Sequence, residues 1–324
     1  MIVGNAFWEA VGGKLADRWA AVAGPALAFW LGGVLAFMLG RGGFRALQPF
    51  SDWLARRSSP LQVAVLVAVL LLVAGSGLVV SRLARPALAL MEGYWPRPLW
   101  PLRKRLASRI TDKADSAGQR FQLLAALTHD GEATPEQREE QMRIDRQLRR
   151  LPSKPRVQPT RVGNTLRSAE TRPIDKYGLD AAAVWPHLWL LLPQATRDEL
   201  AAARRSLDTS VEACIWGLLF LAFTPWTLWA LPAGLAVSSA ATLVWVPARA
   251  EVFADLVEAT FDLHHQLLYR QLRWPLPTDP ADDRVNGRRM TTYLMRGLSG
   301  NSPAFTGADP APADCARTGT EVNS

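Results

Sequence analysis

Long blocks of apolar residues without charge are the dominant pattern in this chain. The longest runs from Val211 to Val246, about 36 residues in which Glu212 is the only charged side chain. A helix needs about 20 apolar residues to cross the core of a bilayer, so this block is too long for one crossing and fits two short ones. Prolines and a glycine near its middle supply a turn. Residues 208–247 are therefore predicted to form a transmembrane hairpin.

Two further uncharged runs precede the hairpin. Residues 21–40 contain no charged side chain, and residues 61–80 contain only two polar ones. Each run is long enough for one span, so residues 21–81 are predicted to form a first transmembrane pair that ends where arginines begin at Arg82. In the link between the two runs, aromatic residues alternate with arginines, which predicts a short helix at the membrane surface.

The first run carries a stripe of small residues. Its members recur at every fourth position: Gly24, Ala28, Gly32, Ala36 and Gly40. Small side chains at this spacing allow a second helix to approach closely, which is how helices associate inside a bilayer. The partner helix belongs either to the same chain, the interpretation we favour, or to a second copy in a homo-oligomer.

The central segment, residues 82–207, is basic. Residues 82–210 hold 23 Lys and Arg against 15 Asp and Glu, so this part alone accounts for the net charge of +8. Basic segments beside membrane helices are typical of the cytoplasmic face near anionic lipid. Because the basic residues are mixed with acidic ones and no recognition motif accompanies them, we expect no nucleic acid partner. Helical patterns, with a capping signal at Thr134–Gln137, predict that this segment is helical.

The two ends of the chain are predicted to differ. Residues 1–20 form an interfacial amphipathic helix or a simple extension of the next helix. Residues 248–297 continue the last span as a cytoplasmic helical extension, with breaks expected at Asp279–Asp283 and at Gly287. Residues 298–324 are rich in glycine, proline, alanine and threonine, with little to bury, and are predicted to be disordered.

These patterns together predict an all-α integral membrane protein with about four transmembrane helices and a cytoplasmic helical portion. The four spans lie near residues 21–40, 61–80, 208–224 and 226–247. Most basic residues that flank the spans lie on the side of the central segment, which predicts that this segment and both termini are cytoplasmic. Four arginines in the link between the first two spans count against this orientation.

An acidic stripe follows the last span. Its members recur at spacings of four and three and share one helix face: Glu251, Asp255, Glu258, Asp262 and His265. We favour an ion-pair face against Arg204, Arg205 or the basic central helices. Two alternatives stay open. The last two members resemble half of a di-metal carboxylate–histidine site, and in an oligomer the acids would ring the mouth of a cation pore.

No catalytic motif or cofactor site emerges from the remaining residues. Cys214 lies in an apolar helix and Cys315 in a polar tail, so neither a disulfide nor a metal-binding pair is expected. The four histidines follow no zinc pattern, and Gly12-Gly13-Lys14 lacks the spacing of a phosphate-binding loop. The sequence therefore predicts no cofactor, no resident metal and no enzymatic activity.

The most distinctive motifs lie just before the hairpin. They are Gly163-Asn164-Thr165-Leu166-Arg167, the acid Glu170, Tyr177-Gly178-Leu179-Asp180 and Trp185-Pro186-His187-Leu188, with Trp274-Pro275-Leu276-Pro277 after the hairpin. This order resembles a family of uncharacterised multi-pass bacterial integral membrane proteins. The resemblance implies a location in the bacterial cytoplasmic membrane. The family has no assigned activity, so no functional residues are carried over.

Two functional hypotheses follow. The first is a non-enzymatic membrane scaffold or signalling subunit whose cytoplasmic helices bind a protein partner. The alternative is an oligomeric ion channel or transporter with the acidic stripe at its cytoplasmic mouth. That alternative needs a polar path through the spans, for which the candidates are Thr227, Ser238, Ser239 and Thr242.

Overall fold

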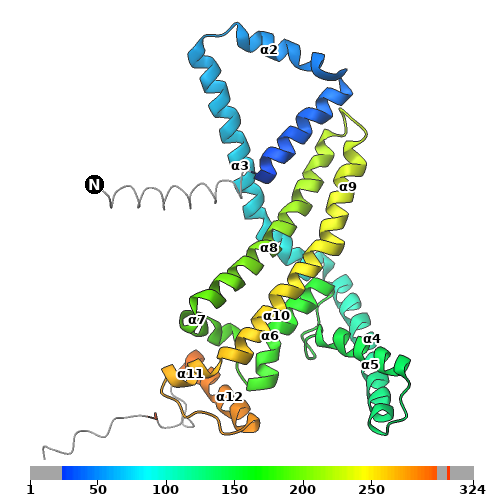
Figure 1. The fold of residues 1–324 in the computed structure, drawn as a ribbon, viewed down its shortest axis with the longest axis vertical. Coiled ribbons are helices and arrows are strands. Elements are labelled where there is room, and N and C mark those ends of the chain that lie inside the picture. Colours follow the sequence, from blue (N-terminus) through cyan, green and yellow to red (C-terminus); the bar gives the residue numbers. More distant parts are fainter. Residues whose placement is uncertain (1–23, 298–304, 307–324) are drawn as a thin grey trace, which may run out of the picture.

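The computed structural model describes residues 24–297 and 305–306, and all regular secondary structure in this part of the chain is helical (Figure 1). The predicted all-α class is therefore confirmed for the described residues. The amphipathic helix predicted for residues 1–20 lies outside them. So does the tail predicted to be disordered, residues 298–324, apart from Phe305 and Thr306.

The first described helix, Gly24–Gly40, precedes the labelled elements. These follow in order as η1 (Gly43–Leu47), α2 (Gln48–Ala55), α3 (Ser59–Glu92), η2 (Arg97–Leu99), α4 (Trp100–His129), α5 (Pro135–Arg149), α6 (Arg161–Tyr177), α7 (Ala181–Leu191), α8 (Gln194–Phe220), η3 (Leu221–Phe223), α9 (Ala230–Ala240), η4 (Ala241–Trp245), α10 (Val246–His264), α11 (Gln266–Gln271) and α12 (Pro280–Arg296). Apolar helices gather at one end of the elongated molecule. Helices α4 to α7, α11 and α12 gather at the other end (Figure 1).

Three helical stretches of the described chain are long and apolar enough to cross a membrane. They lie within Ser59–His129, Gln194–Phe223 and Ala230–His264. The predicted span at residues 21–40 is described from Gly24 and ends at Gly40, where the chain bends by 109° into Gly43–Ala55. The described residues thus contain three candidate spans, or four if this bent pair counts as one.

Helix α3 does not end where its apolar run ends, as we had expected at Arg82. It continues to Glu92 and includes Pro86. The reason lies in one continuous buried face, formed by Val73, Gly77, Val80, Ala84 and Leu88. The lower part of this face packs against α8 and α6 outside the apolar stretch. This burial offsets the backbone hydrogen bond that a proline removes.

The transmembrane hairpin predicted for residues 208–247 consists of α8 and α9, joined by a turn at 224–229. The two helices approach most closely at Gly217, where an added Cβ would lie 2.5 Å from Ser238 Oγ and 3.0 Å from the carbonyl oxygen of Gly234. Ser238 Oγ donates a hydrogen bond to the carbonyl oxygen of Cys214 at 3.2 Å. Small residues and an interhelical hydrogen bond therefore hold the hairpin together.

The return helix contains a π-helical turn, η4, immediately before Pro247. The backbone N–H of Val246 donates to the carbonyl oxygen of Ala241, five residues earlier. A proline lacks the N–H that an α-helix needs, and its ring crowds the preceding turn. The wider π turn accommodates Pro247, so the helix continues into α10 without ending.

Part of the small-residue stripe faces this hairpin. An added Cβ on Gly32 would lie 2.9 Å from the ring of Phe220, and one on Gly40 would lie 1.7 Å from the carbonyl oxygen of Trp226. Ala36 is 4% exposed. The other two members of the stripe, Gly24 and Ala28, are exposed.

The helical extension is interrupted between Gln271 and Pro280, so a break does precede the start of α12. The predicted continuation of this break to Asp283 and the second break at Gly287 are wrong, because α12 is one continuous helix from Pro280 to Arg296. Asp279 is its N-cap and accepts hydrogen bonds from two backbone N–H groups of the first turn. Gly287 lies inside the helix where a Cβ would meet the carbonyl oxygen of Tyr177 at 1.9 Å. This glycine therefore permits close packing of α12 on the end of α6 instead of breaking the helix.

Candidate functional site: an ion-pair ladder and an arginine-lined cleft

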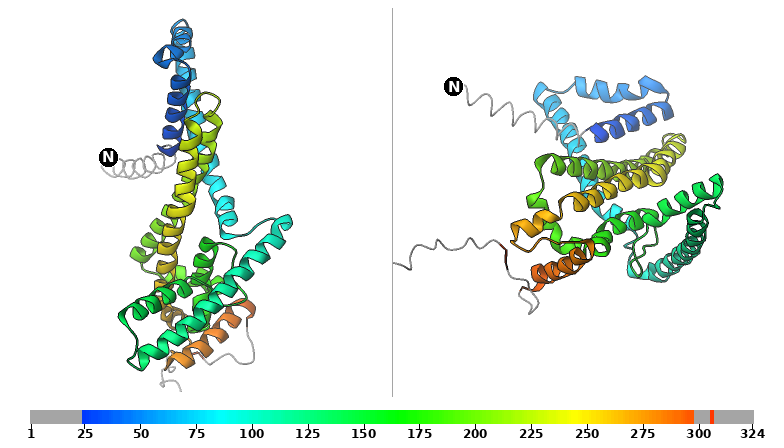
Figure 2. Two further views of the ribbon diagram at one scale, coloured as in Figure 1. Left: turned by 90° about the vertical axis from the view of Figure 1, so that its right-hand side faces the viewer. Right: turned by 60° about the horizontal axis from the view of Figure 1, so that its bottom comes forward.

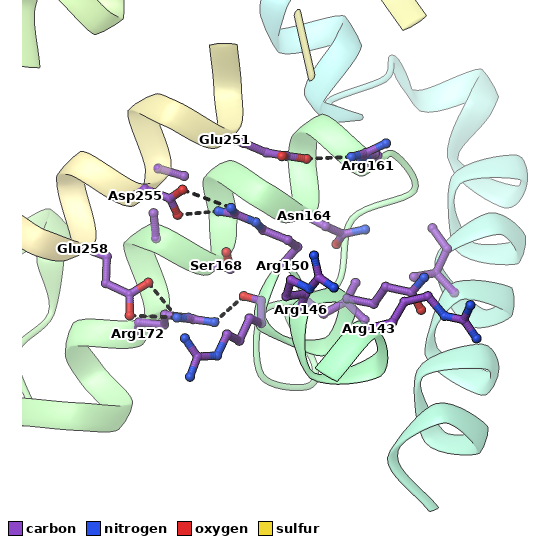
Figure 3. A pocket seen from close by; sticks show the side chains of 16 residues that line it. Arg143, Arg146, Arg150, Arg161, Asn164, Ser168, Arg172, Glu251, Asp255 and Glu258 are labelled. Atoms are coloured by element: carbon purple, nitrogen blue, oxygen red, sulfur yellow. Dashed lines mark hydrogen bonds and ion pairs between the residues drawn. The ribbon is translucent and has the colours of Figure 1, made fainter. Parts of the chain in front are cut away.

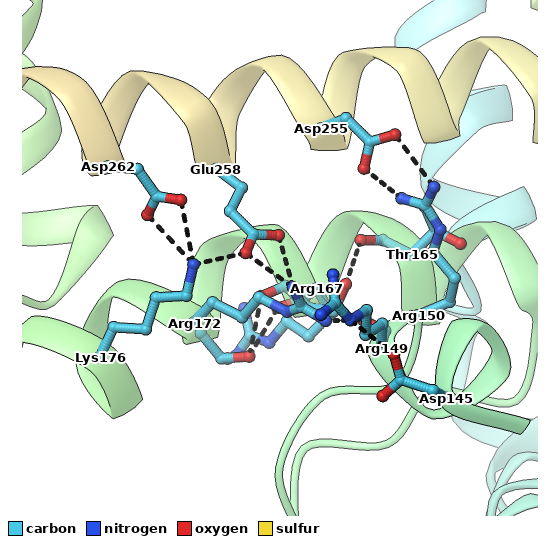
Figure 4. Close-up of polar contacts among 12 residues, drawn as sticks. Asp145, Arg149, Arg150, Thr165, Arg167, Arg172, Lys176, Asp255, Glu258 and Asp262 are labelled. Atoms are coloured by element: carbon cyan, nitrogen blue, oxygen red, sulfur yellow. Dashed lines mark hydrogen bonds and ion pairs between the residues drawn. The ribbon is translucent and has the colours of Figure 1, made fainter. Parts of the chain in front are cut away.

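The acidic stripe lies on the face of α10 that packs against α6 (Figure 4). The apolar stretch ends at Pro247, so the stripe starts about one turn beyond it and extends about 17 Å along the helix from Glu251 to Asp262. Basic residues of α6 and of the end of α5 face it. The structure therefore places the stripe between helices of the same chain.

The upper half of the stripe pairs with two arginines. Glu251 contacts Arg161 at 2.7 Å. Asp255 receives both terminal nitrogens of Arg150, with one N–O distance of 3.0 Å. This second pair joins α10 to the residue that caps α5, and its two-pronged geometry is the strong form of an arginine–carboxylate contact.

The lower half is more buried and forms a network. Glu258 accepts from Arg172 at 2.6 Å and from Lys176 at 2.7 Å, and its side chain is 20% exposed. Lys176 also contacts Asp262 at 3.1 Å. Arg172 donates in addition to the backbone carbonyl of Arg149, so one guanidinium joins α5, α6 and α10 (Figure 4).

The network changes the ionisation of its members. Burial disfavours the charged form of Glu258, but hydrogen bonds from Lys176 and Arg172 outweigh it and hold its pKa below the usual range. Burial likewise opposes the charge of Lys176, whose pKa nevertheless rises because it donates to Glu258 and Asp262. Both groups are therefore held in their charged forms.

Acid is expected to weaken this network. A carboxylate with a depressed pKa contributes stability that is present above its unfolded value of 4.5 and is lost as pH falls below it. The E258Q variant should therefore melt at a lower temperature than the wild type at neutral pH and lose less stability as pH falls from about 5 to about 3. Melting curves in detergent at several pH values measure this. E132Q, at an exposed position, serves as the control. Equal pH slopes for E258Q and the wild type would contradict the expectation.

The last member of the stripe, His265, belongs to a separate buried network. Its Nε2 lies 2.9 Å from Asp283 on α12, and its Nδ1 lies 2.7 Å from the carbonyl oxygen of Phe261. Both ring nitrogens thus lie within hydrogen-bond distance of an oxygen, one from the backbone and one from a carboxyl group. Tyr269 donates to the same carboxylate at 3.0 Å, and the ring of Tyr177 stacks on the imidazole at 4.1 Å.

The ion-pair face expected against the basic central helices is therefore present, although no individual partner on those helices was predicted. One signal for these partners was available. Arg161, Arg172 and Lys176 share one face of α6, at spacings of eleven and four, which matches a basic face to the acidic one. Neither Arg204 nor Arg205 pairs with the stripe in the described residues; Arg204 contacts Asp208 at 3.2 Å. No sequence pattern indicates Asp283 as a partner of His265, because it lies within the predicted helix break.

The metal interpretation finds no further ligands. Asp262 contacts Lys176 and Tyr177, whereas His265 contacts Asp283, so the two side chains are engaged in different networks. Within the described ranges, no group of three His, Cys, Asp or Glu side chains is arranged to hold a metal ion. Two of the polar residues considered for a pore, Ser238 and Thr242, instead donate hydrogen bonds to backbone carbonyl oxygens of the hairpin.

The ion pairs from Glu251–Arg161 to Asp262–Lys176 form a ladder along α10. A cleft of about 960 Å³ opens beside this ladder, between α5, α6 and α10 (Figure 3). Six arginines line it: Arg143, Arg146, Arg149, Arg150, Arg161 and Arg172. Three acids of the stripe also line it, so the cleft carries three more positive than negative groups. Ile110, Leu151, Ala169 and Ala254 contribute apolar wall.

Comparison with known proteins adds no relative. No family model matches the chain, and neither the curated proteins nor the solved structures that were searched contain a match. The resemblance to multi-pass bacterial membrane proteins noted from the sequence therefore stays a prediction.

Proposed function

We propose that this protein is a non-enzymatic membrane scaffold or signalling subunit that binds a protein partner through the helices outside the bilayer. The membrane part of the proposal is supported by the large number of apolar side chains that the long helices expose. Leu66 and Leu71 on α3 are 59% and 65% exposed, and Trp229 at the hairpin tip is 77% exposed. A soluble monomer rarely exposes apolar surface so extensively, whereas lipid covers such surface without cost.

The observation that carries the partner-binding part is the α4–α5 arm, residues 100–149. The views in Figures 1 and 2 show that the arm lies to one side of the lower group of helices, which includes α6 and α12. Its helices have only two buried side chains, Leu124 and Ile144. They are held to each other by polar contacts such as Arg120–Glu140 at 3.0 Å. Most of the surface of both helices is therefore free for another protein.

Beyond the first turn of α4, two large exposed apolar side chains interrupt the charged surface of the arm. Leu123 on α4 is 61% exposed, and Met142 on α5 is 58% exposed. Removing such side chains from water against a partner is favourable. We take these two residues as the points at which a partner docks.

The ladder weighs against the channel alternative. Each carboxylate from Glu251 to Asp262 has a cationic partner within the described chain. A ring of such acids at a pore mouth would have little net negative charge to offer a cation. Ion flux through reconstituted vesicles that changes on neutralising Asp255 would favour the alternative instead.

The test is affinity capture of the full-length protein from detergent-solubilised native membranes, followed by quantitative mass spectrometry. A partner of the arm should be enriched by the wild type and depleted at least about tenfold by the L123E/M142E variant, because two buried charges disrupt an interface anchor. L263E, which alters a residue on α10 that is 76% exposed, is the matched control and should retain the partner. The same set of proteins with all three baits would contradict the proposal.

A further inference from the structure

We propose that the arginine-lined cleft between α5, α6 and α10 is a binding site for a phosphoryl anion, with Arg143 and Arg146 as its principal ligands. This site is distinct from the exposed apolar residues through which the arm is proposed to bind protein. It rests on charge that the chain itself leaves without a counterion.

Three of the six cleft arginines are already neutralised by the stripe. Arg150, Arg161 and Arg172 each pair with one carboxylate on α10. Arg149 pairs with Asp145 on its own helix at 3.1 Å. Two of the six cleft arginines form none of these ion pairs.

Those two are Arg143 and Arg146, which extend from α5 along the cleft wall (Figure 3). In the described part of the chain, neither has a carboxylate within ion-pair distance. Glu140, one turn before Arg143, is bound by both prongs of Arg120. Arg146 makes only a backbone contact, to the carbonyl of Met142. Within the described residues both arginines thus line the cleft without an ion-pair contact, and Arg143 has only the electrostatic interaction with Glu140 one turn away.

The geometry of the cleft favours an anion of particular chemistry. Residues three apart on a helix lie on the same face, so Arg143 and Arg146 both line the same cleft and can reach into it. A guanidinium presents a planar fork of N–H donors that matches the oxygens of a phosphate. Apolar walls focus the positive potential and exclude part of the solvent. A volume of about 960 Å³ exceeds what one phosphate fills and suits a phosphorylated molecule of ligand size.

The phosphoryl group has two sources that fit this position. The Arg161–Glu251 end of the cleft lies about one turn beyond the apolar stretch, within reach of the headgroup layer. A phosphorylated lipid headgroup therefore fits, as does a soluble phosphorylated molecule. Both use the same arginines, and the experiment separates them.

The experiment uses the full chain in nanodiscs of neutral phosphatidylcholine, titrated with inorganic pyrophosphate at constant ionic strength and followed by calorimetry. In a second arm, nanodiscs contain increasing phosphatidylglycerol and thermal stability is recorded. We expect saturable stabilisation in at least one arm. The R143Q/R146Q variant should weaken the response at least about tenfold, because charge-assisted hydrogen bonds to phosphate are lost. A response to pyrophosphate assigns a soluble ligand, and a response to phosphatidylglycerol alone assigns a lipid.

The matched control is R138Q/R289Q, which removes two exposed arginines that do not line the cleft. It should bind like the wild type. Because Arg143 and Arg146 are exposed, their replacement should leave the melting temperature without ligand unchanged, which checks folding. The proposal is overturned if neither arm shows saturable binding, if both double variants respond alike, or if a tetraglutamate peptide binds more tightly than pyrophosphate.

Discussion

Replacing His265 with leucine is expected to lower the free energy of unfolding by about 1–3 kcal/mol, the cost of leaving a buried hydrogen-bonding group without its partner. The side chains of His265 and Asp283 are only 6% and 12% exposed. Without the imidazole, the Asp283 carboxylate keeps only the hydroxyl of Tyr269 as a side-chain partner in the described chain. Unfolding of the purified protein in mixed detergent micelles, titrated with denaturing detergent, measures the loss.

A double variant separates the pair from the packing around it. H265L/D283L replaces both hydrogen-bond partners by apolar side chains, which can be nearly neutral. We therefore expect it to be more stable than H265L alone. If H265L costs no more than H265L/D283L, the Asp283 carboxyl group left without its partner carries no penalty, and the hydrogen-bond account of this network is wrong.

The second large effect is expected inside the hairpin. The G217A variant adds a Cβ that would lie 2.5 Å from Ser238 Oγ and 2.9 Å from its backbone nitrogen, so α8 and α9 must separate. Overpacking of this kind costs about 1–3 kcal/mol. It should also weaken the hydrogen bond from Ser238 to the carbonyl of Cys214. The same detergent titration, together with the melting temperature, measures the change.

The chain offers a matched control in another apolar helix. Gly75 lies within α3, and an added Cβ there has no atom within 4 Å. G75A should therefore leave stability unchanged or raise it, by up to about 1 kcal/mol from helix propensity. Equal destabilisation by G75A and G217A would show that the close helix approach at Gly217 has no special role.

Local signals in the sequence predicted much of the helical layout. The uncharged blocks located the apolar helices and the turn of the hairpin. The signal at Thr134–Gln137 is a capping box that starts α5, as predicted. Each of these features depends on neighbours along the chain, so a local pattern is sufficient to find it.

Features that depend on distant partners were predicted only in outline or not at all. The acidic stripe was expected to pair with the basic central helices, but its individual partners were not predicted. The partners of the acidic stripe lie 82 to 105 residues away along the chain, on α5 and α6. Gly287 was predicted to break the helix, but in the structure it allows α12 to pack closely against the backbone of Tyr177. The π turn before Pro247 arises because a packed helix must continue beyond a proline. None of these can be derived from the local composition alone.

The central claim is that lipid surrounds the apolar helices and that α2 and the α4–α5 arm lie on opposite sides of a membrane. Single-cysteine labelling tests it most directly, with Cys214 and Cys315 replaced by alanine. In intact cells, a membrane-impermeant maleimide should label S51C on α2 and should label R138C on α5 only after the membrane is permeabilised. Labelling of both positions in intact cells, or recovery of the protein in the soluble fraction without detergent, would contradict the account.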